Sequence, residues 1–241
     1  MRKIKKTSEL LWLMGIVLVA LGVAICSKAD LGVSMIAAPA FILSEKLLTV
    51  SSIFTVGVTE YLIQGVILLV LCIVIRRFDW RFLLTFTVAV IYGYTIDLFM
   101  LIFENVVFEE IWLRWVMLIV GDLIIGVGVA CYFRTYMPLQ VYELFVSEIT
   151  KRFNFKINKT KRIFDYSLLV ISITLSIVLF FDFLEFDWSA IGYRSFHSIG
   201  LGTVVTTALN AVLIMLGGKL LDRFFEPTPL LPKLYDLIKI K

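Results

Sequence analysis

Two aspartates lie within long apolar stretches of this 241-residue chain. Asp122 is near the middle of the stretch WVMLIVGDLIIGVGVA, and Asp97 is about two-thirds of the way through residues 82–103, one turn after Gly93. An ionisable side chain costs roughly 2.5–3.5 kcal/mol at the centre of a membrane helix, so such residues are the first candidates for function. Asp122 could couple transport to a proton or cation or contact a substrate, or it could be a protonated acid that hydrogen-bonds a neighbouring helix. Asp97 could line a cavity or lie at a helix interface.

Two basic residues lie at the ends of apolar stretches, beside helix breaks. We expect Lys28 and Arg134 to extend their charged ends to the lipid headgroups, as long basic side chains at membrane boundaries do. The alternative is that each pairs with a nearby acid, Lys28 with Asp30 and Arg134 with Glu143.

Amides and glycines complete the candidate set. Gln64 and Asn210 lie within apolar stretches, where side-chain amides more often hydrogen-bond between helices than contact a ligand. Gln140 and Glu143 follow the break at Pro138 and are candidates for a substrate or ion pathway. Small residues let helices approach closely, so packing is the expected role of the glycines in the two stretches. These are Gly15, Gly22, Gly121, Gly126 and Gly128.

Enzyme motifs are absent from the sequence. It holds neither G-x-x-x-x-G-K-[ST] nor H-E-x-x-H. Its single histidine, His197, lies at an outer boundary and gives no basis for a Ser-His-Asp set. Cys26, Cys72 and Cys131 all lie in apolar stretches, where buried thiols are the usual state. Their spacing matches no metal site. We therefore expect neither enzymatic activity nor a cofactor or metal.

Composition places the chain in a membrane. Hydrophobic residues make up 60% of it, against about 45–50% in soluble domains. A net charge of +4, without a basic patch interleaved with aromatics, argues against nucleic-acid binding. Six stretches reach the length of about 20 residues that a membrane helix needs, and two shorter ones resemble re-entrant or interfacial helices. The six are 10–28, 53–75, 82–103, 111–133, 163–181 and 197–218, and the short ones are 33–49 and 138–150. The sequence thus predicts one all-α polytopic membrane domain.

Charge predicts the orientation of this domain. The N-terminal arm, the 76–81 loop, the loop KRFNFKINKTKR at 151–162 and the C-terminal tail are basic, whereas the loops around 104–110 and 182–187 are acidic. Basic loops stay in the cytoplasm, so a chain with six spans in the cell membrane has both termini on the cytoplasmic side. The tail 227–241 has an amphipathic pattern that predicts a short helix on the membrane surface.

A weak internal repeat runs through the chain. At an offset of 106 residues, Gly15 aligns with Gly121, Gly22 with Gly128, and the cation Lys28 with Arg134. Residues 10–103 and 111–218 would then each hold three spans and one short helix. Because three is odd, the second copy must be inverted relative to the first, as in many secondary transporters.

The stretch KADLGVS after a glycine-punctuated first helix, with Gly93 and Asp97 late in the third span, resembles the bacterial integral-membrane family named after YczE, YyaS and YitT. Met35 departs from this pattern, since the family tends to place a proline there. The resemblance implies a polytopic bacterial membrane protein.

The inverted repeat, the paired breaks and Asp122 favour a secondary transporter of a small solute, driven by a proton or sodium gradient. Two alternatives remain open at this stage. The chain could be a non-transporting accessory or regulatory membrane protein that docks a partner on the basic segment 151–162, or a substrate-binding membrane subunit of a multi-part importer.

Overall fold

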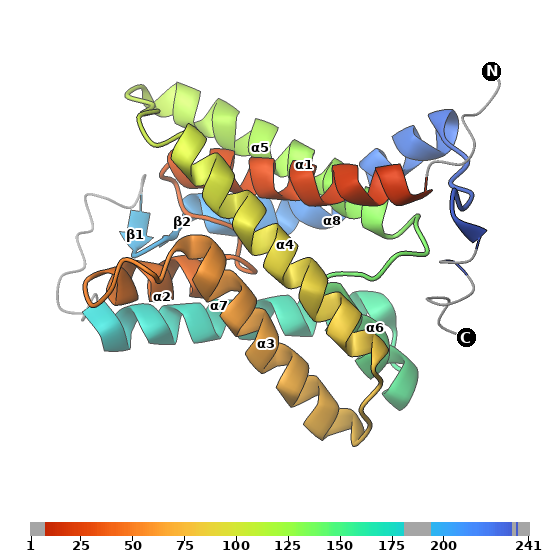
Figure 1. Cartoon of the computed structure of the whole chain (residues 1–241). Helices are drawn as coiled ribbons and strands as arrows, with labels where there is room; N and C mark the ends of the chain where they lie inside the picture. Colours follow the sequence, from red (N-terminus) through yellow and green to blue (C-terminus); the bar gives the residue numbers. More distant parts are fainter. Residues whose placement is uncertain (1–7, 181–193, 233–234, 236–241) are drawn as a thin grey trace.

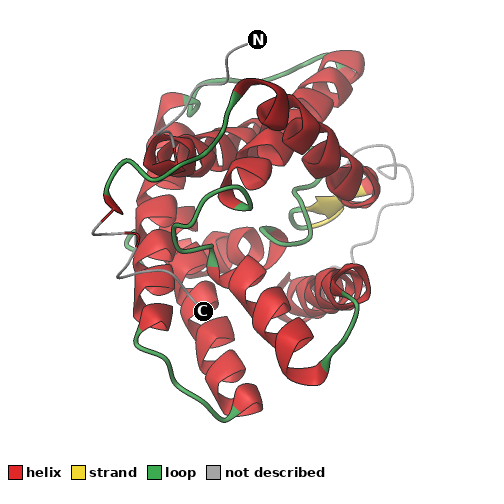
Figure 2. Ribbon diagram, turned by 90° about the vertical axis from the view of Figure 1, so that its right-hand side faces the viewer, coloured by secondary structure: helices red, strands yellow, loops and turns green. Residues whose placement is uncertain are grey.

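A computed structural model describes residues 8–180, 194–232 and 235 of the chain (Figure 1). Within these residues it contains eight helices and one small antiparallel hairpin. The helices are α1 (Ser8–Lys28), α2 (Ala38–Leu48), α3 (Val56–Ile75), α4 (Arg81–Ile102), α5 (Ile111–Tyr132), α6 (Val141–Phe153), α7 (Ile157–Phe180) and α8 (Leu201–Phe224). The strands are β1 (Arg194–Phe196) and β2 (Ile199–Gly200). Figure 2 shows that helices make up most of the described chain, joined by loops, with the two short strands at one edge.

The predicted all-α polytopic fold is confirmed. Six helices, all but α2 and α6, are long and apolar enough to cross a membrane. Large apolar side chains on their outer faces are exposed, including Leu69, Ile73 and Leu101. Exposed apolar faces on so many helices match a hydrocarbon environment and not water. The protein is a multi-pass membrane protein.

Several predicted boundaries were wrong. α7 begins at Ile157 instead of 163, so only a short turn separates it from α6 and most of the segment 151–162 is helical. α8 begins at Leu201 instead of 197 because the hairpin occupies the residues before it. It continues to Phe224, past the predicted end at 218. The acidic loop around 182–187 and much of the tail 227–241 lie outside the described residues.

The two short helices also start later than predicted. α2 begins at Ala38 rather than 33, because Gly32 adopts a left-handed conformation, with φ of 100°, and Pro39 then stands in the first turn of the helix. A proline there removes only an N–H that has no partner within a helix anyway. α6 begins at Val141 rather than 138, after the Pro138 break.

Antiparallel helices α1 and α5 form the centre of the bundle. α4 packs against α1, and α8 packs against α5. Around this centre, α2 packs against α3 and α7, while α6 also packs against both α3 and α7. Each short helix therefore lies between the same two long ones. Buried apolar residues of α1, α2, α4 and α5 form one continuous core cluster.

The two ends of the bundle carry different segments (Figure 1). We call one the acidic end: it holds the turn between α2 and α3, the loop between α4 and α5, and the hairpin. The other, the basic end, holds the turns 76–80 and 154–156, the start of α1 and the end of α8. Each short helix starts deep in the bundle. α2 runs from there to the acidic end, and α6 runs to the basic end, where Ile149 packs in one cluster with Ile75 of α3 and Phe82 of α4.

Candidate functional site

A small polar cavity lies where the two short helices begin. The residues that precede them, Ala37 before α2 and Gln140 before α6, both line it. Its volume is about 30 Å³, which suits a single water or ion. Its other polar lining residues come from the loop before α2 and from α3, α4, α6, α7 and α8: Ser34, Glu60, Tyr92, Tyr142, Glu143, Lys161 and Asn210. We call this space the inner cavity.

Glu60 of α3 is tied to the start of α6. Its Oε1 accepts hydrogen bonds from the Tyr142 hydroxyl at 2.9 Å and from Gln64 Nε2 at 3.2 Å. Gln64 in turn accepts a hydrogen bond from the Val141 backbone N–H at 3.4 Å. Only 1% of the surface of Glu60 is exposed. A carboxylate of α3 therefore fixes the position of α6 through two side chains.

Three buried oxygens at the inner cavity lack a donor. Glu60 Oε2, Glu143 Oε2 and Asn210 Oδ1 accept no hydrogen bond from any described residue. Buried polar atoms in native proteins nearly always have partners, and exceptions call for an explanation such as a bound ion or water. The cavity is thus rich in acceptors.

One cation of the cavity is already paired. Lys161 Nζ lies 3.0 Å from Asp165 Oδ1, one turn further along α7. It also lies 6.0 Å above the centre of the Phe164 ring. Lys161 acts electrostatically on Glu143 as well. Glu143 and Asp165 therefore share this one lysine, which leaves the site short of positive charge.

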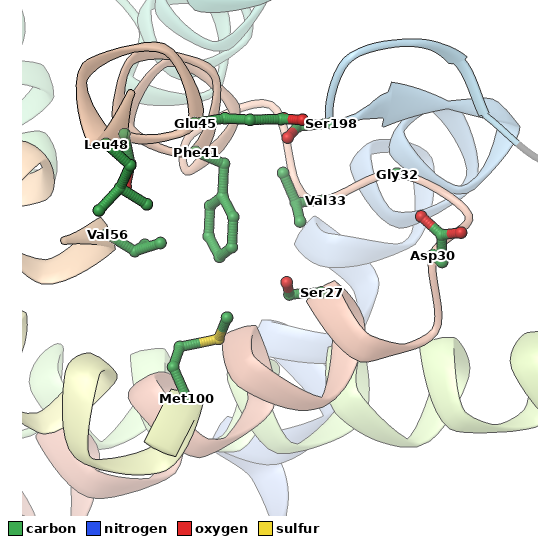
Figure 3. A pocket seen from close by; sticks show the side chains of 11 residues that line it. Ser27, Asp30, Gly32, Val33, Phe41, Glu45, Leu48, Val56, Met100 and Ser198 are labelled. Carbon is green, nitrogen blue, oxygen red and sulfur yellow. The ribbon is translucent and has the colours of Figure 1, made fainter. Parts of the chain in front are cut away.

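A larger pocket of about 220 Å³ lies nearer the acidic end (Figure 3). Its lining includes Ser27, Asp30, Phe41, Glu45 and Met100. Phe41 stands among Val56, Met100 and Val33, and the Glu45 carboxylate points toward Ser198 (Figure 3). His197 Nε2 lies 3.7 Å from Glu45 Oε1. We call this space the outer pocket.

The inner cavity lies one helical turn deeper than the outer pocket on three helices. The corresponding outer and inner lining residues are Ser27 and Val23 of α1, Phe41 of α2 and Ala37 just before it, and Val56 and Glu60 of α3. One turn is about 5.4 Å of helix. Val33 and Phe41 of the outer pocket belong to the same buried apolar cluster as Val23 and Ala37 of the inner cavity. A thin apolar layer therefore separates the two spaces.

The family model described as a family of unknown function (DUF6198) matches residues 6–219. The chain belongs to this family. It is also 26% identical over 216 residues to the uncharacterized protein YyaS of Bacillus subtilis (strain 168), covering 88% of this chain and 92% of YyaS. These findings confirm the predicted relationship to the YczE and YyaS group. No solved structure matches the chain. All residues of the inner cavity and the outer pocket lie within the matched range.

The structure brings together four of the sequence-predicted candidates. Gln140, Glu143 and Asn210 line the inner cavity, and Gln64 adjoins it through Glu60. Gln140 donates a hydrogen bond to the Tyr132 hydroxyl at 3.3 Å. These residues come from α3, α6 and α8 and from the loop before α6, so only the folded bundle joins them.

The two aspartates that the sequence made the leading functional candidates, Asp122 and Asp97, do not line the inner cavity. Asp122 is 1% exposed but does not line the inner cavity; it faces α1, close enough to the Cys26 thiol to interact with it electrostatically. Asp97 caps α3: its carboxylate accepts hydrogen bonds from the Thr55 hydroxyl at 2.6 Å and from the Gly57 N–H at 2.7 Å.

The ion pairs considered as an alternative for Lys28 and Arg134 do not form. Lys28 donates instead to the carbonyl oxygen of Glu104 at 3.1 Å, and Asp30 pairs with Arg114 at 3.4 Å.

Arg134 points toward the basic end and donates two hydrogen bonds to the Asp222 carboxylate, at 2.6 and 2.7 Å. These hydrogen bonds raise the pKa of the Arg134 guanidinium. Glu143 points the other way, into the cavity, which is why it is out of reach.

Glu60 is the functional candidate that sequence reasoning missed. It is the one acid within Val56–Ile75, so the rule applied to Asp122 and Asp97 would also have selected it. Asp165, within the predicted span 163–181, falls under the same rule. Tyr92, Tyr142 and Lys161 carry no comparable signal, because their role depends on which side of each helix meets the cavity.

Proposed function

We propose that the protein is a secondary transporter that moves a small polar or organic solute across the cell membrane. The observation that carries this proposal is the inner cavity, a polar space inside a membrane bundle where two broken helices begin. Transporter sites recur at such places because unwound backbone and helix ends supply polar groups within the apolar bundle. The outer pocket supplies an approach from the acidic end.

Helix contacts support the inverted repeat that this function implies. The offset of 106 residues aligns Gly15 with Gly121 and Gly22 with Gly128. The close contacts between α1 and α5 join Gly15 with Gly128 and Gly22 with Gly121, so the alignment exchanges one contact for the other. The same exchange relates the packing of α2 on α7 to that of α6 on α3. Contacts of this kind are expected when two inverted copies meet around a two-fold axis in the membrane plane.

Charge supports an orientation with both termini in the cytoplasm. The turns 76–80 and 154–156 lie at the basic end together with the start of α1 and the end of α8. Lys and Arg accumulate in cytoplasmic loops, so the basic end would face the cytoplasm. The outer pocket would then open toward the exterior.

The thin apolar layer offers an outer gate. Phe41 lines the outer pocket and belongs to this layer, and movement of α2 by about one turn would be enough to join the two spaces. The barrier on the other side includes Tyr132, Gln140 and Tyr142, whose hydrogen bonds join the loop before α6 to α5 and α6 to α3. Alternating access would open one barrier while the other stays closed.

Flux through purified protein in liposomes tests the proposal. A panel of labelled small metabolites should contain at least one that enters protein-containing liposomes faster than empty ones. Ser34→Leu, which fills the inner cavity, should block that flux while the protein still folds and melts cooperatively. Thr174→Leu, which replaces an exposed hydroxyl of α7, is the matched control and should transport normally. If no solute enters faster than in empty liposomes, the protein is not a transporter of this kind.

A further inference from the structure

We propose that the inner cavity contains a binding site for one monovalent inorganic cation, held by Glu60, Glu143 and Asn210. The proposal rests on the proposed function in that the cation would be the coupling ion of transport. Its geometric basis is independent, because it concerns binding within the cavity and requires no movement of solute.

The acceptor atoms point to a cation. Each of the three residues supplies an oxygen that accepts no hydrogen bond from the described residues. Glu60 and Glu143 are 1% and 6% exposed, and both line the cavity together with Asn210. Buried carboxylates without donors are costly unless a cation or proton neutralises them. Carboxylate and amide oxygens are also the ligands that hard cations prefer.

Size favours a monovalent ion. A cavity of about 30 Å³ holds one desolvated ion. Mg²⁺ usually keeps several of its waters, and Ca²⁺ takes 6–8 oxygens, for which this cavity has no room.

The surrounding charges leave the pair of glutamates uncompensated. The titratable groups that face it are Tyr92 of α4, Tyr132 of α5, Tyr142 of α6 and Lys161 and Asp165 of α7. The tyrosines are neutral donors, and Lys161 is paired with Asp165 at 3.0 Å. Two carboxylates that share a buried site repel each other when both are ionised. One added positive charge, either Na⁺ or a proton, removes this repulsion.

The network around Glu60 gives the bound ion a structural effect. Glu60 already holds α6 through Tyr142 and Gln64. A cation on the second oxygens of Glu60 and Glu143 would add a direct link between α3 and α6. Occupancy of the site would thus stabilise the closed barrier on the side of α6.

Thermal melting of the whole purified protein tests the site. We would titrate Na⁺ at constant ionic strength, with choline as the replacing cation, at several pH values. If Na⁺ binds, the melting temperature should rise by roughly 5–10 °C near saturation. The rise should shrink as the pH falls, because protons compete for the same carboxylates. If the proton is the ligand, Na⁺ should have no effect, and the melting temperature should instead rise with acidity.

Variants show whether the response of the melting temperature to Na⁺ or to pH arises in the inner cavity. Glu60→Gln and Glu143→Gln should abolish it, whereas Glu148→Gln, which removes an acid on the same helix α6 near the basic end, should keep it. Asn210→Leu leaves both carboxylates in place and should weaken Na⁺ binding at least tenfold, or reduce the pH response. It therefore serves if either glutamine variant fails to fold.

No response of the wild-type protein to Na⁺ or pH, or a response that survives in the glutamine variants, would overturn the proposal. Cation binding without flux in liposomes would retain the site and reject transport. Flux without any response to cations would retain transport and reject the cation site.

Discussion

Gly22 of α1 lies directly against Gly121 of α5, so closely that a Cβ atom on Gly22 would stand 2.6 Å from the Gly121 carbonyl oxygen. Gly15 and Gly128 form the corresponding contact two turns away along the helix pair, where a Cβ on Gly15 would lie 3.0 Å from the Gly128 carbonyl oxygen. The two helices at the centre of the bundle therefore touch through their backbones. Lipid offers no hydrophobic driving force between helices, so such close packing is a main source of their association.

Gly22→Ala should destabilise the protein by about 1–3 kcal/mol, because the added methyl group must push α1 away from α5. The matched control is Gly65→Ala on α3, whose Cβ would meet only the ring of Phe86, at 3.2 Å. Melting temperatures in detergent compare the two. Equal melting temperatures would show that the backbone contact is not needed for stability.

Asp97 should behave as a helix cap and not as a transport residue. Asp97→Ala removes both acceptors for the start of α3 and should cost about 1–2 kcal/mol of stability. Asp97→Asn keeps one acceptor for the Gly57 N–H and should cost less. Transport per folded molecule should remain unchanged in both variants, and a loss of ion-driven uptake by the Asn variant alone would indicate a coupling role.

Asp122 is buried without a partner for its Oδ2 among the described residues. Leu has the same number and branching of side-chain heavy atoms as Asp, and replacement by Leu removes the unfavourable burial of this polar group. Asp122→Leu should therefore be as stable as wild type or more stable, by about 1 kcal/mol. Because the residue lies off the inner cavity, Asp122→Asn should retain ion-driven uptake. Normal folding of Asp122→Asn with loss of accumulation would instead make Asp122 the coupling group.

The orientation can be checked by cysteine labelling of intact cells. A membrane-impermeant thiol reagent should reach Asn105→Cys in the α4–α5 loop and should not reach Phe155→Cys in the α6–α7 turn. Both positions are exposed. The unmodified chain, in which Cys26 and Cys131 are buried and Cys72 is partly buried, supplies the background signal. Labelling of Phe155→Cys alone would invert the proposed topology.

Sequence reasoning identified the long helices well and placed their ends less accurately. A run of about 20 apolar residues has few alternatives to a membrane helix, since every backbone N–H and C=O must find a partner within it. The ends depend on local competition. Residues 157–162 are polar enough to read as a loop, yet they continue α7 as helix, and residues 194–200 form a hairpin where the hydropathy indicated the start of α8.

The sequence by itself determined the class of protein, the six long helices, the two breaks and the family, because hydropathy and local motifs are properties of contiguous residues. Only the tertiary structure decided which polar residues share a site. Glu60, Glu143 and Asn210 lie on three helices far apart in the chain, and whether they meet depends on how each helix is rotated about its own axis. Each of these membrane helices carries apolar residues on nearly all of its faces, so the spacing of apolar residues does not reveal which face points inward. That rotation is set by packing between helices, for example by the close contact of Gly57 of α3 with Gly93 of α4.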